Sequence, residues 1–103
     1  MINPAGTKKV GLEPKGEVRI VTDTTTEIAD DKLIVCNKAT AMTVNLLAAT
    51  GSKRTLEIGS INNGVVTVTT NGADTINGEE TQSVYNGSCM VIKDYAANKW
   101  IIT

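Results

Sequence analysis

Short segments of alternating apolar and polar residues constrain this 103-residue chain more than any other feature. The segments are rich in Val, Ile and Thr, and period-two alternation of such residues is typical of β-strands with one buried face. The segments are EVRIVT (17–22), KLIVCN (32–37), MTVNLL (42–47), RTLEIGS (54–60), GVVTVTT (64–70), QSVYN (82–86), SCMVIKD (88–94) and KWII (99–102). The sequence therefore predicts a single all-β domain over residues 17–103, built from about eight short strands.

Asn-Gly pairs separate the strands of the C-terminal half. Both residues tolerate a positive φ, so an Asn-Gly pair is the strongest short-range signal for a two-residue hairpin. The four pairs are Asn63-Gly64, Asn71-Gly72, Asn77-Gly78 and Asn86-Gly87. We therefore expect a meander of hairpins here. Residues 26–33 and 46–53 are the only candidates for a helical turn, and Gly51 favours a loop in the second.

The alternation divides the strand residues into two faces. One face is largely polar, with residues such as Thr43 and Thr67. The predicted core on the other face consists of Val18, Ile20, Leu33, Val35, Val44, Leu46, Leu56, Ile58, Val66, Val68, Ile76, Val84, Met90, Ile92 and Ile101. One-sided alternation of this kind predicts a compact antiparallel sandwich or a small barrel.

Residues 1–16 have a different composition from the rest of the chain. They contain both prolines, three of the nine glycines, three lysines and one glutamate, which gives a net charge of +2, whereas residues 17–103 carry −3. Proline lacks the backbone N–H and glycine raises the entropy lost on ordering, so we expect a flexible, irregular arm. Two interpretations remain open, a loose tail and a segment that becomes ordered on a partner's surface.

The composition predicts an oligomer. The chain has no Phe, one Trp and two Tyr, so the core is mainly aliphatic. A chain of this length buries only about 65% of its unfolded surface, and association with further subunits is a common supplement to such a small core.

Charge and hydropathy exclude two classes of partner. The formal net charge of −1, without clustered Lys and Arg, argues against nucleic-acid binding. No run approaches the roughly 18 apolar residues that a membrane helix needs, and the N-terminus lacks the pattern of a signal peptide. We therefore expect a soluble protein made in the cytoplasm, with no membrane partner.

The two cysteines, Cys36 and Cys89, are too few and too far apart for a disulfide framework or a metal knuckle. Each lies in an apolar run, which favours two buried thiols that act as small hydrophobic side chains. A disulfide between them is the alternative interpretation.

The segment NGADTINGEETQ (71–82) raises the question of a calcium site. An EF-hand loop beginning at Asp74 would need an oxygen ligand where Ile76 stands, so that motif fails. Gly72, Asp74 and Ile76 match the second half of a calcium-binding β-roll repeat, but neither neighbouring segment continues the period. A turn, strand and turn with Ile76 in the core is the preferred interpretation. The alternative is a calcium site with the ligands Asp74, Asn77, Glu79 and Glu80.

Residues for other chemistry are scarce. The chain has no His, so the commonest general base near neutral pH is missing. The carboxylate pairs Asp30-Asp31 and Glu79-Glu80 fall in predicted loops without nearby aromatic residues, which favours solvated acids over glycoside hydrolysis. No glycine-rich phosphate loop precedes a helix. We expect a non-enzymatic protein without cofactor, metal or small-molecule substrate.

Residues 55–102 contain six elements in a recognisable order, a strand ending in Asn, a "G.vtV" strand, a "gdtIdG" turn, two further segments and a closing "W.ii" strand. They occupy 56–62, 65–68, 73–78, 82–88, 90–94 and 100–102. This arrangement resembles a β-module common in tailed-bacteriophage virion proteins, namely capsid decoration and head-fibre proteins and segments of tail fibres or collars. Residues 44–54 look like the piece that precedes the module, but Leu47 stands where proline is usual.

The resemblance implies a structural role in a virion. A small module after a 16-residue arm favours a capsid decoration (cement) or head-fibre protein, and many proteins of this group are homotrimers. The implied partner is the major capsid protein and the implied location is the capsid surface of a virion assembled in the host cytoplasm. The arm residues expected to bind the capsid are Pro4, Lys8, Lys9, Val10, Leu12 and Lys15. The alternative is a receptor-binding β-module of a tail fibre.

Overall fold

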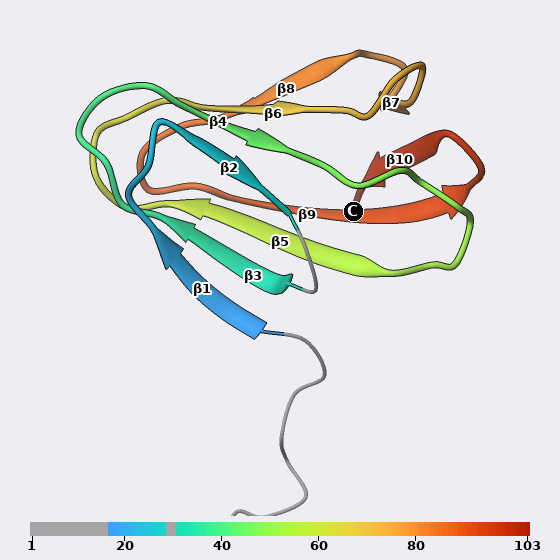
Figure 1. The fold of residues 1–103 in the computed structure, drawn as a ribbon, viewed down its shortest axis with the longest axis horizontal. Coiled ribbons are helices and arrows are strands. Elements are labelled where there is room, and N and C mark those ends of the chain that lie inside the picture. The colour runs from blue at the N-terminus through green and yellow to red at the C-terminus, as the bar shows by residue number, and fades with distance from the viewer. Residues whose placement is uncertain (1–16, 29–30) are drawn as a thin grey trace, which may run out of the picture.

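The computed structural model describes residues 17–28 and 31–103, which form ten strands in two sheets, one above the other in Figure 1. The strands are β1 (Glu17–Val21), β2 (Thr25–Glu27), β3 (Asp31–Cys36), β4 (Met42–Asn45), β5 (Thr55–Ser60), β6 (Val66–Thr69), β7 (Thr75–Ile76), β8 (Thr81–Val84), β9 (Cys89–Ala96) and β10 (Lys99–Ile102). The described residues contain no helix, including those of the two stretches proposed for a helical turn. The all-β class predicted from the alternation is confirmed.

Consecutive strands alternate between the two sheets as far as β9. The six-stranded sheet has the order β1-β3-β5-β9-β10-β7 and the four-stranded sheet the order β2-β4-β6-β8. Because each sheet receives every second strand, the chain from β1 to β6 winds as a flattened coil of three turns, with one strand of each turn in each sheet. Strands β8, β9 and β10 then pair antiparallel with β6, β5 and β9.

The predicted antiparallel arrangement is wrong for five of the eight strand pairings. Strands β1, β3 and β5 are parallel to one another, as are β2, β4 and β6, and β7 is parallel to β10. Period-two alternation specifies which face of a strand is buried but carries no information on direction. The direction follows from the connections, because a chain that crosses to the other sheet and returns after a full turn adds a parallel strand.

The second and third turns of the coil are in constant register. Ile34 lies beside Ile58 in one sheet and Val44 lies beside Val68 in the other, and both pairs are 24 positions apart in the sequence. Like side chains therefore stack along the coil on the inner face of each sheet.

The prediction of a hairpin meander from the Asn-Gly pairs is also wrong. All four pairs lie where the chain passes from one sheet to the other, and the hairpin that joins neighbouring strands, β9–β10, turns at Asn98, with φ of 65°. A positive φ reverses the chain but does not decide which strands pair. Asn77-Gly78 comes closest to the expected turn, since both φ angles are positive and Ile76 and Glu79 exchange backbone hydrogen bonds of 2.7 and 2.9 Å.

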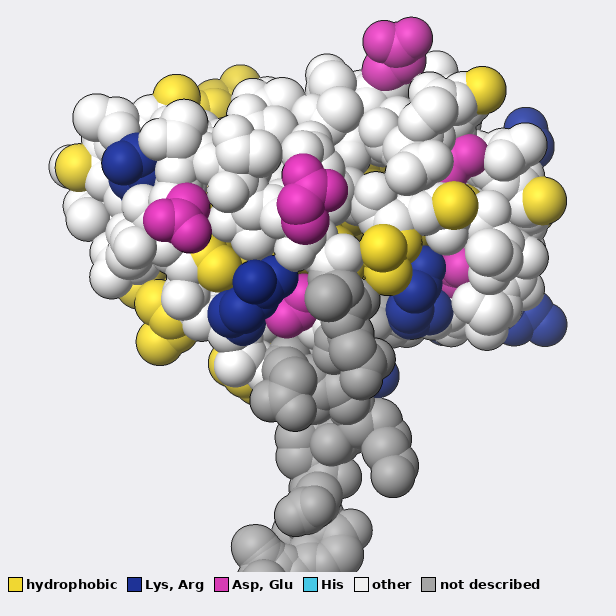
Figure 2. Space-filling model, in the orientation of Figure 1, with side chains coloured by type: hydrophobic (Ala, Val, Ile, Leu, Met, Phe, Trp, Pro, Cys, Tyr) yellow, Lys and Arg dark blue, Asp and Glu magenta, His cyan; other side chains and the backbone are white. Residues whose placement is uncertain are grey.

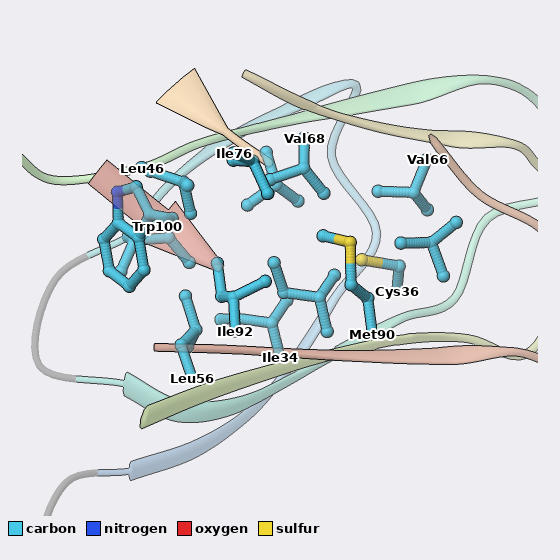
Figure 3. Close-up of a cluster of buried hydrophobic side chains, with 14 of the residues drawn as sticks. Ile34, Cys36, Leu46, Leu56, Val66, Val68, Ile76, Met90, Ile92 and Trp100 are labelled. Atoms are coloured by element: carbon cyan, nitrogen blue, oxygen red, sulfur yellow. The ribbon is translucent and has the colours of Figure 1, made fainter. Parts of the chain in front are cut away.

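The core fills the space between the two sheets, where side chains of both point toward each other (Figure 3). The six-stranded sheet contributes Ile34, Ile58 and Ile92, and the four-stranded sheet contributes Val44 and Val68, all fully buried. Full burial of each such aliphatic side chain is worth roughly 1.5–3 kcal/mol, so the core is built from many similar contributions.

Five residues placed in the core from sequence lie on the opposite face. Val18, Ile20 and Ile101 are exposed, and Leu33 and Val35 are half-buried. In β3 and β10 apolar residues occur at both odd and even positions, so alternation could not decide which face points inward. In β1 the alternation favoured the wrong face, because the polar position Arg19 is used for the ion pair with the buried Asp31. A one-residue error in this choice moves every side chain to the other face. The inner positions belong to Val21, Ile34, Cys36 and Trp100.

Candidate functional site

Among the described residues, the side chain of Asp94 accepts the largest group of hydrogen bonds, on the inner face of β9 next to the loop 46–54. Its Oδ1 accepts a hydrogen bond of 2.5 Å from the backbone N–H of Arg54, and its Oδ2 accepts bonds from the Thr50 N–H and the Ser52 hydroxyl at 3.2 and 3.0 Å. Burial raises the pKa of Asp94, but these bonds and the Arg54 charge outweigh it, so the pKa lies below its ordinary value. An ionised carboxylate occupied by four neighbouring groups organises a loop and is not available as an acid or base.

Arg54 connects this loop to the closing strand. Its guanidinium lies 5.5 Å from the centroid of the Trp100 ring and 3.8 Å from Oδ2 of Asp94. The loop itself reverses at Gly51 and Lys53, which have φ of 81° and 64°. The loop predicted at Gly51 is confirmed. No sequence motif marked Asp94, although it follows the inward-facing Met90 and Ile92 at the same spacing of two.

The segment 71–82 forms turns on either side of the buried residue Ile76. Ile76 is fully buried in β7, which confirms the turn, strand and turn interpretation. Asp74 is also buried, and its Oδ2 accepts a hydrogen bond of 2.9 Å from the Ala49 N–H. The Asn77 Oδ1 accepts one of 3.0 Å from the Ile102 N–H. Both side chains proposed as calcium ligands thus hold neighbouring backbone in place.

The remaining proposed calcium ligands do not join them. Glu79 and Glu80 are exposed to solvent. Within residues 17–28 and 31–103, no three His, Cys, Asp or Glu side chains gather in a way that could hold a metal ion. The geometry gives no support to the calcium alternative.

Asp31 differs from the solvated acid expected at its position. Its carboxylate is buried and accepts two hydrogen bonds from the Arg19 guanidinium, at 3.1 and 3.0 Å. Arg19 also donates to the Glu27 carbonyl at 2.8 Å, so it links the first turn of the coil across the sheets. Asp30, its neighbour in the sequence, lies outside the described residues.

The cysteines have unlike environments, and both are free. Cys36 is buried in the core, as expected, and burial raises the pKa of its thiol to about 11. Cys89 is exposed, so its predicted burial is wrong. Desolvation and the nearby Glu57 carboxylate raise the pKa of Cys89 as well, which lowers its thiolate fraction and its reactivity as a nucleophile.

Apolar side chains are exposed on the face of the six-stranded sheet that points away from the other sheet. We call this surface the outer face and define it by the outward residues of β1, β3, β5 and β9. Two rows of neighbours cross it, Val18-Leu33-Glu57-Val91 and Ile20-Val35-Gly59-Cys89. The strand β1, which follows directly on residues 1–16, carries Val18 and Ile20, which are 58% and 65% exposed.

A shallow groove of about 200 Å³ lies between β8 and β9. Its lining includes Tyr85, Cys89, Met90 and Ile102, which are mainly apolar, together with the hydroxyl groups of Ser83 and Ser88. Among the described residues, no Asp, Glu, Lys or Arg lines it, and its titratable groups are the Tyr85 phenol and the Cys89 thiol, so the groove offers mainly contact surface.

Charged side chains of both signs are interspersed over the face of the molecule that Figure 2 shows. No large area of a single sign is visible there. The six arm residues proposed to bind a capsid, Pro4 to Lys15, lie outside the described residues.

Comparison of the chain with protein-family models, curated proteins and solved structures gives no match. In the part of the chain that the structure describes, no helix has the length and hydropathy needed to cross a membrane.

Proposed function

We propose that this protein is a non-enzymatic structural protein of a tailed-bacteriophage virion that binds the outside of the capsid as a decoration or head-fibre protein. The resemblance of residues 55–102 to a virion β-module supports the proposal. Each of the six elements that carry this resemblance overlaps one strand, from β5 to β10.

The observation that supports a binding role is that the interior polar side chains hold the protein's own backbone in place. Asp94, Asp74 and the Arg19–Asp31 pair hold backbone segments together. The surface keeps the outer face, with its exposed Val18 and Ile20, and the edges of the two sheets, which are suited to contact with other proteins.

The mechanism is multivalent attachment. The arm orders against the major capsid protein, with apolar contacts from Pro4, Val10 and Leu12 and charge attraction from Lys8, Lys9 and Lys15. Copies arranged as a homotrimer present several arms at once, and binding to the assembled shell stabilises it by mass action.

Immunogold electron microscopy of virions of the source phage, with antibody against this chain, tests the proposal. Label spread over the heads is expected. Label confined to the tail would replace the capsid role with that of a tail-fibre receptor-binding module, and unlabelled virions would remove the virion role altogether.

Deletion of residues 1–16 tests the arm. The shortened protein is expected to keep the circular dichroism spectrum of the β domain and to lose binding to isolated heads in a sedimentation assay. A matched control replaces only Lys8, Lys9 and Lys15 by Gln, which removes the charge and keeps the length. Unchanged head binding by the shortened protein would remove the arm from the mechanism.

A further inference from the structure

Strand β8, at the top of Figure 1, is an edge of the four-stranded sheet, with β6 on one side and no described strand on the other. The Thr70 N–H donates a hydrogen bond of 3.1 Å to the Glu80 carbonyl, and the antiparallel pairing with β6 continues to Val84. Because successive residues of a strand direct their backbone groups to opposite sides, the N–H and C=O groups of Thr81 and Ser83 point away from β6. β8 therefore presents backbone donors and acceptors with which a further strand can pair.

The other sheet edges have features that hinder the addition of a strand. The register of β1 shifts between Glu17 and Val18, β2 has three residues and β7 has two. Bulges and short length are common protections of an edge. The sequence of β8, TQSV, contains no charged residue and no proline, and its register is unbroken. Such an edge favours pairing with another strand.

The groove of about 200 Å³ lies along this edge. Its lining comes from β8 of one sheet and from β9 and β10 of the other, so it lies between the two sheets. Val84 and Met90, which line it, point toward the core. A strand added beside β8 would direct every second side chain toward this apolar space. Backbone pairing, combined with pockets for alternate side chains, is how extended peptides bind to sheet edges.

Two exposed acids, Glu79 and Glu80, precede β8 directly. They attract an occupant that carries positive charge where its strand begins. The groove beyond them favours apolar side chains two positions apart.

Residues 5–13, AGTKKVGLE, have this pattern. Lys8 and Lys9 come first, and Val10 and Leu12 follow with the spacing that places both on one face of a strand. The segment lies between the two prolines of the chain, so each of its residues has a backbone N–H to pair with. Both its charge and its alternation therefore match the β8 edge.

We propose that strand β8 and the adjoining groove bind residues 5–13 of a second copy as an added strand. The added strand runs parallel to β8, which places its two apolar residues over the groove and its lysine pair beside the acids that precede β8. An arm that enters the groove of the next copy makes a head-to-tail contact, which closes as a ring.

The chain's own arm does not reach this groove. Leu12 is five positions before Glu17, so at most about 18 Å of chain separates the two residues. β1 and β9 are three strands apart in the six-stranded sheet, about 14 Å, and β8 lies in the other sheet, about 10 Å away. A path over the surface covers both distances, so the strand comes from another copy.

This contact needs only the purified chain. Its failure is therefore distinguishable from failure of the capsid role, which is read on virions. The same arm residues are proposed to touch the capsid, so the two contacts exclude each other and arm exchange belongs to the protein free of capsid.

Sedimentation equilibrium of the full chain over a wide concentration range tests the association. Leu12→Asp is expected to raise the dissociation constant at least about tenfold, because an apolar side chain no longer enters the groove. Ile2→Asp is the matched control, since it makes the same kind of change in the arm outside residues 5–13. It is expected to leave association unchanged.

A charge exchange locates the contact. Reversal of both acids, Glu79→Lys with Glu80→Lys, places like charges together and is expected to raise the dissociation constant about tenfold. Addition of Lys8→Glu and Lys9→Glu to the same chain is expected to restore association, which a merely structural effect of the first two changes would not allow. Asp23→Lys, at an exposed bend, is the control and should change association little.

Hydrogen exchange of the full chain reads the backbone pairing directly. The amide protons of Thr81 and Ser83 are expected to become protected as the concentration rises through the dissociation constant. In Leu12→Asp the same amide protons are expected to stay unprotected at those concentrations.

Three results would overturn the proposal. The first is a full chain that stays monomeric at every concentration. The second is an association that Leu12→Asp and the reversal of both acids leave unchanged. The third is an associated form in which the amide protons of Thr81 and Ser83 exchange as fast as in the monomer.

Discussion

The backbone N–H of Arg54 donates a hydrogen bond of 2.5 Å to the Oδ1 of Asp94, which joins the loop between β4 and β5 to strand β9. The same carboxylate accepts the Thr50 N–H and the Ser52 hydroxyl. One buried side chain therefore closes a loop that contains two residues with positive φ, Gly51 and Lys53. Arg54, held in this way, also covers the ring of Trp100.

Replacement of Asp94 should destabilise the fold. Asp94→Ala leaves several partly buried donors without an acceptor and removes the bonds that hold the loop, so it is expected to lower the free energy of unfolding by about 3 kcal/mol. Urea denaturation measures the change. Asp23→Ala, at an exposed bend between β1 and β2, is the control and should have almost no effect. Similar losses in the two variants would contradict the role assigned to Asp94.

Stability should fall on acidification, in part through Asp94. The pKa of Asp94 in the folded chain lies below its ordinary value of 3.8, so the carboxylate contributes stability above that pH and loses it as the pH falls through the lower folded pKa. The free energy of unfolding, measured from neutral pH down to about pH 2, should therefore decline less steeply in Asp94→Asn than in the parent chain. Equal slopes in the two proteins would refute the linkage.

Gly64 should tolerate no side chain. A Cβ at this position would lie 2.2 and 2.4 Å from the carbonyl oxygens of Thr40 and Lys38, and both are backbone atoms that cannot move freely. Gly64→Ala is expected to cost about 3 kcal/mol, visible as a lower urea midpoint. Gly59→Ala serves as the control because its Cβ has room, and it should leave the stability of the dilute protein nearly unchanged. A Gly64→Ala protein as stable as this control would show that the backbone around residues 38, 40 and 64 moves apart to make room for the methyl group.

Replacement of a valine by alanine should cost more stability on the inner face than on the outer face. Val44 is fully buried between the sheets, so Val44→Ala is expected to cost about 2 kcal/mol. Val35 is half-buried on the outer face, and Val35→Ala should cost less than about 1 kcal/mol in dilute solution. Thermal unfolding of both variants makes the comparison. The reverse order would mean that the inward and outward positions are assigned wrongly.

Sequence reasoning located most of the strands but not all of them. Eight alternating segments correspond to strands. The short β7 was expected only as a brief strand between two turns, with Ile76 in the core, and β2 was missed. Strand β2 consists of Thr25, Thr26 and Glu27, which lack an apolar alternation, and its backbone pairing with β4 supplies what the side chains do not signal.

Prediction of the polar contacts was more limited. Asp74 attracted attention as a calcium candidate, yet its partner, the Ala49 N–H, is 25 positions away in the sequence. Asp94 could have been noticed as an acid on the inward side of β9, after Met90 and Ile92. Its partners in the loop 46–54 are about 40 positions away, so spacing alone could not identify them.

The sequence by itself determined the all-β class and the burial of Ile76, because period-two alternation and turn residues act through local backbone preference and side-chain burial. Only the tertiary structure decided the parallel coil, the inward face of β1 and β3, and the role of Asp94. Each of these depends on which segments come together after the chain crosses between sheets. Strands apolar on both faces, such as β3, acquire an inner and an outer side only when one face meets a second sheet.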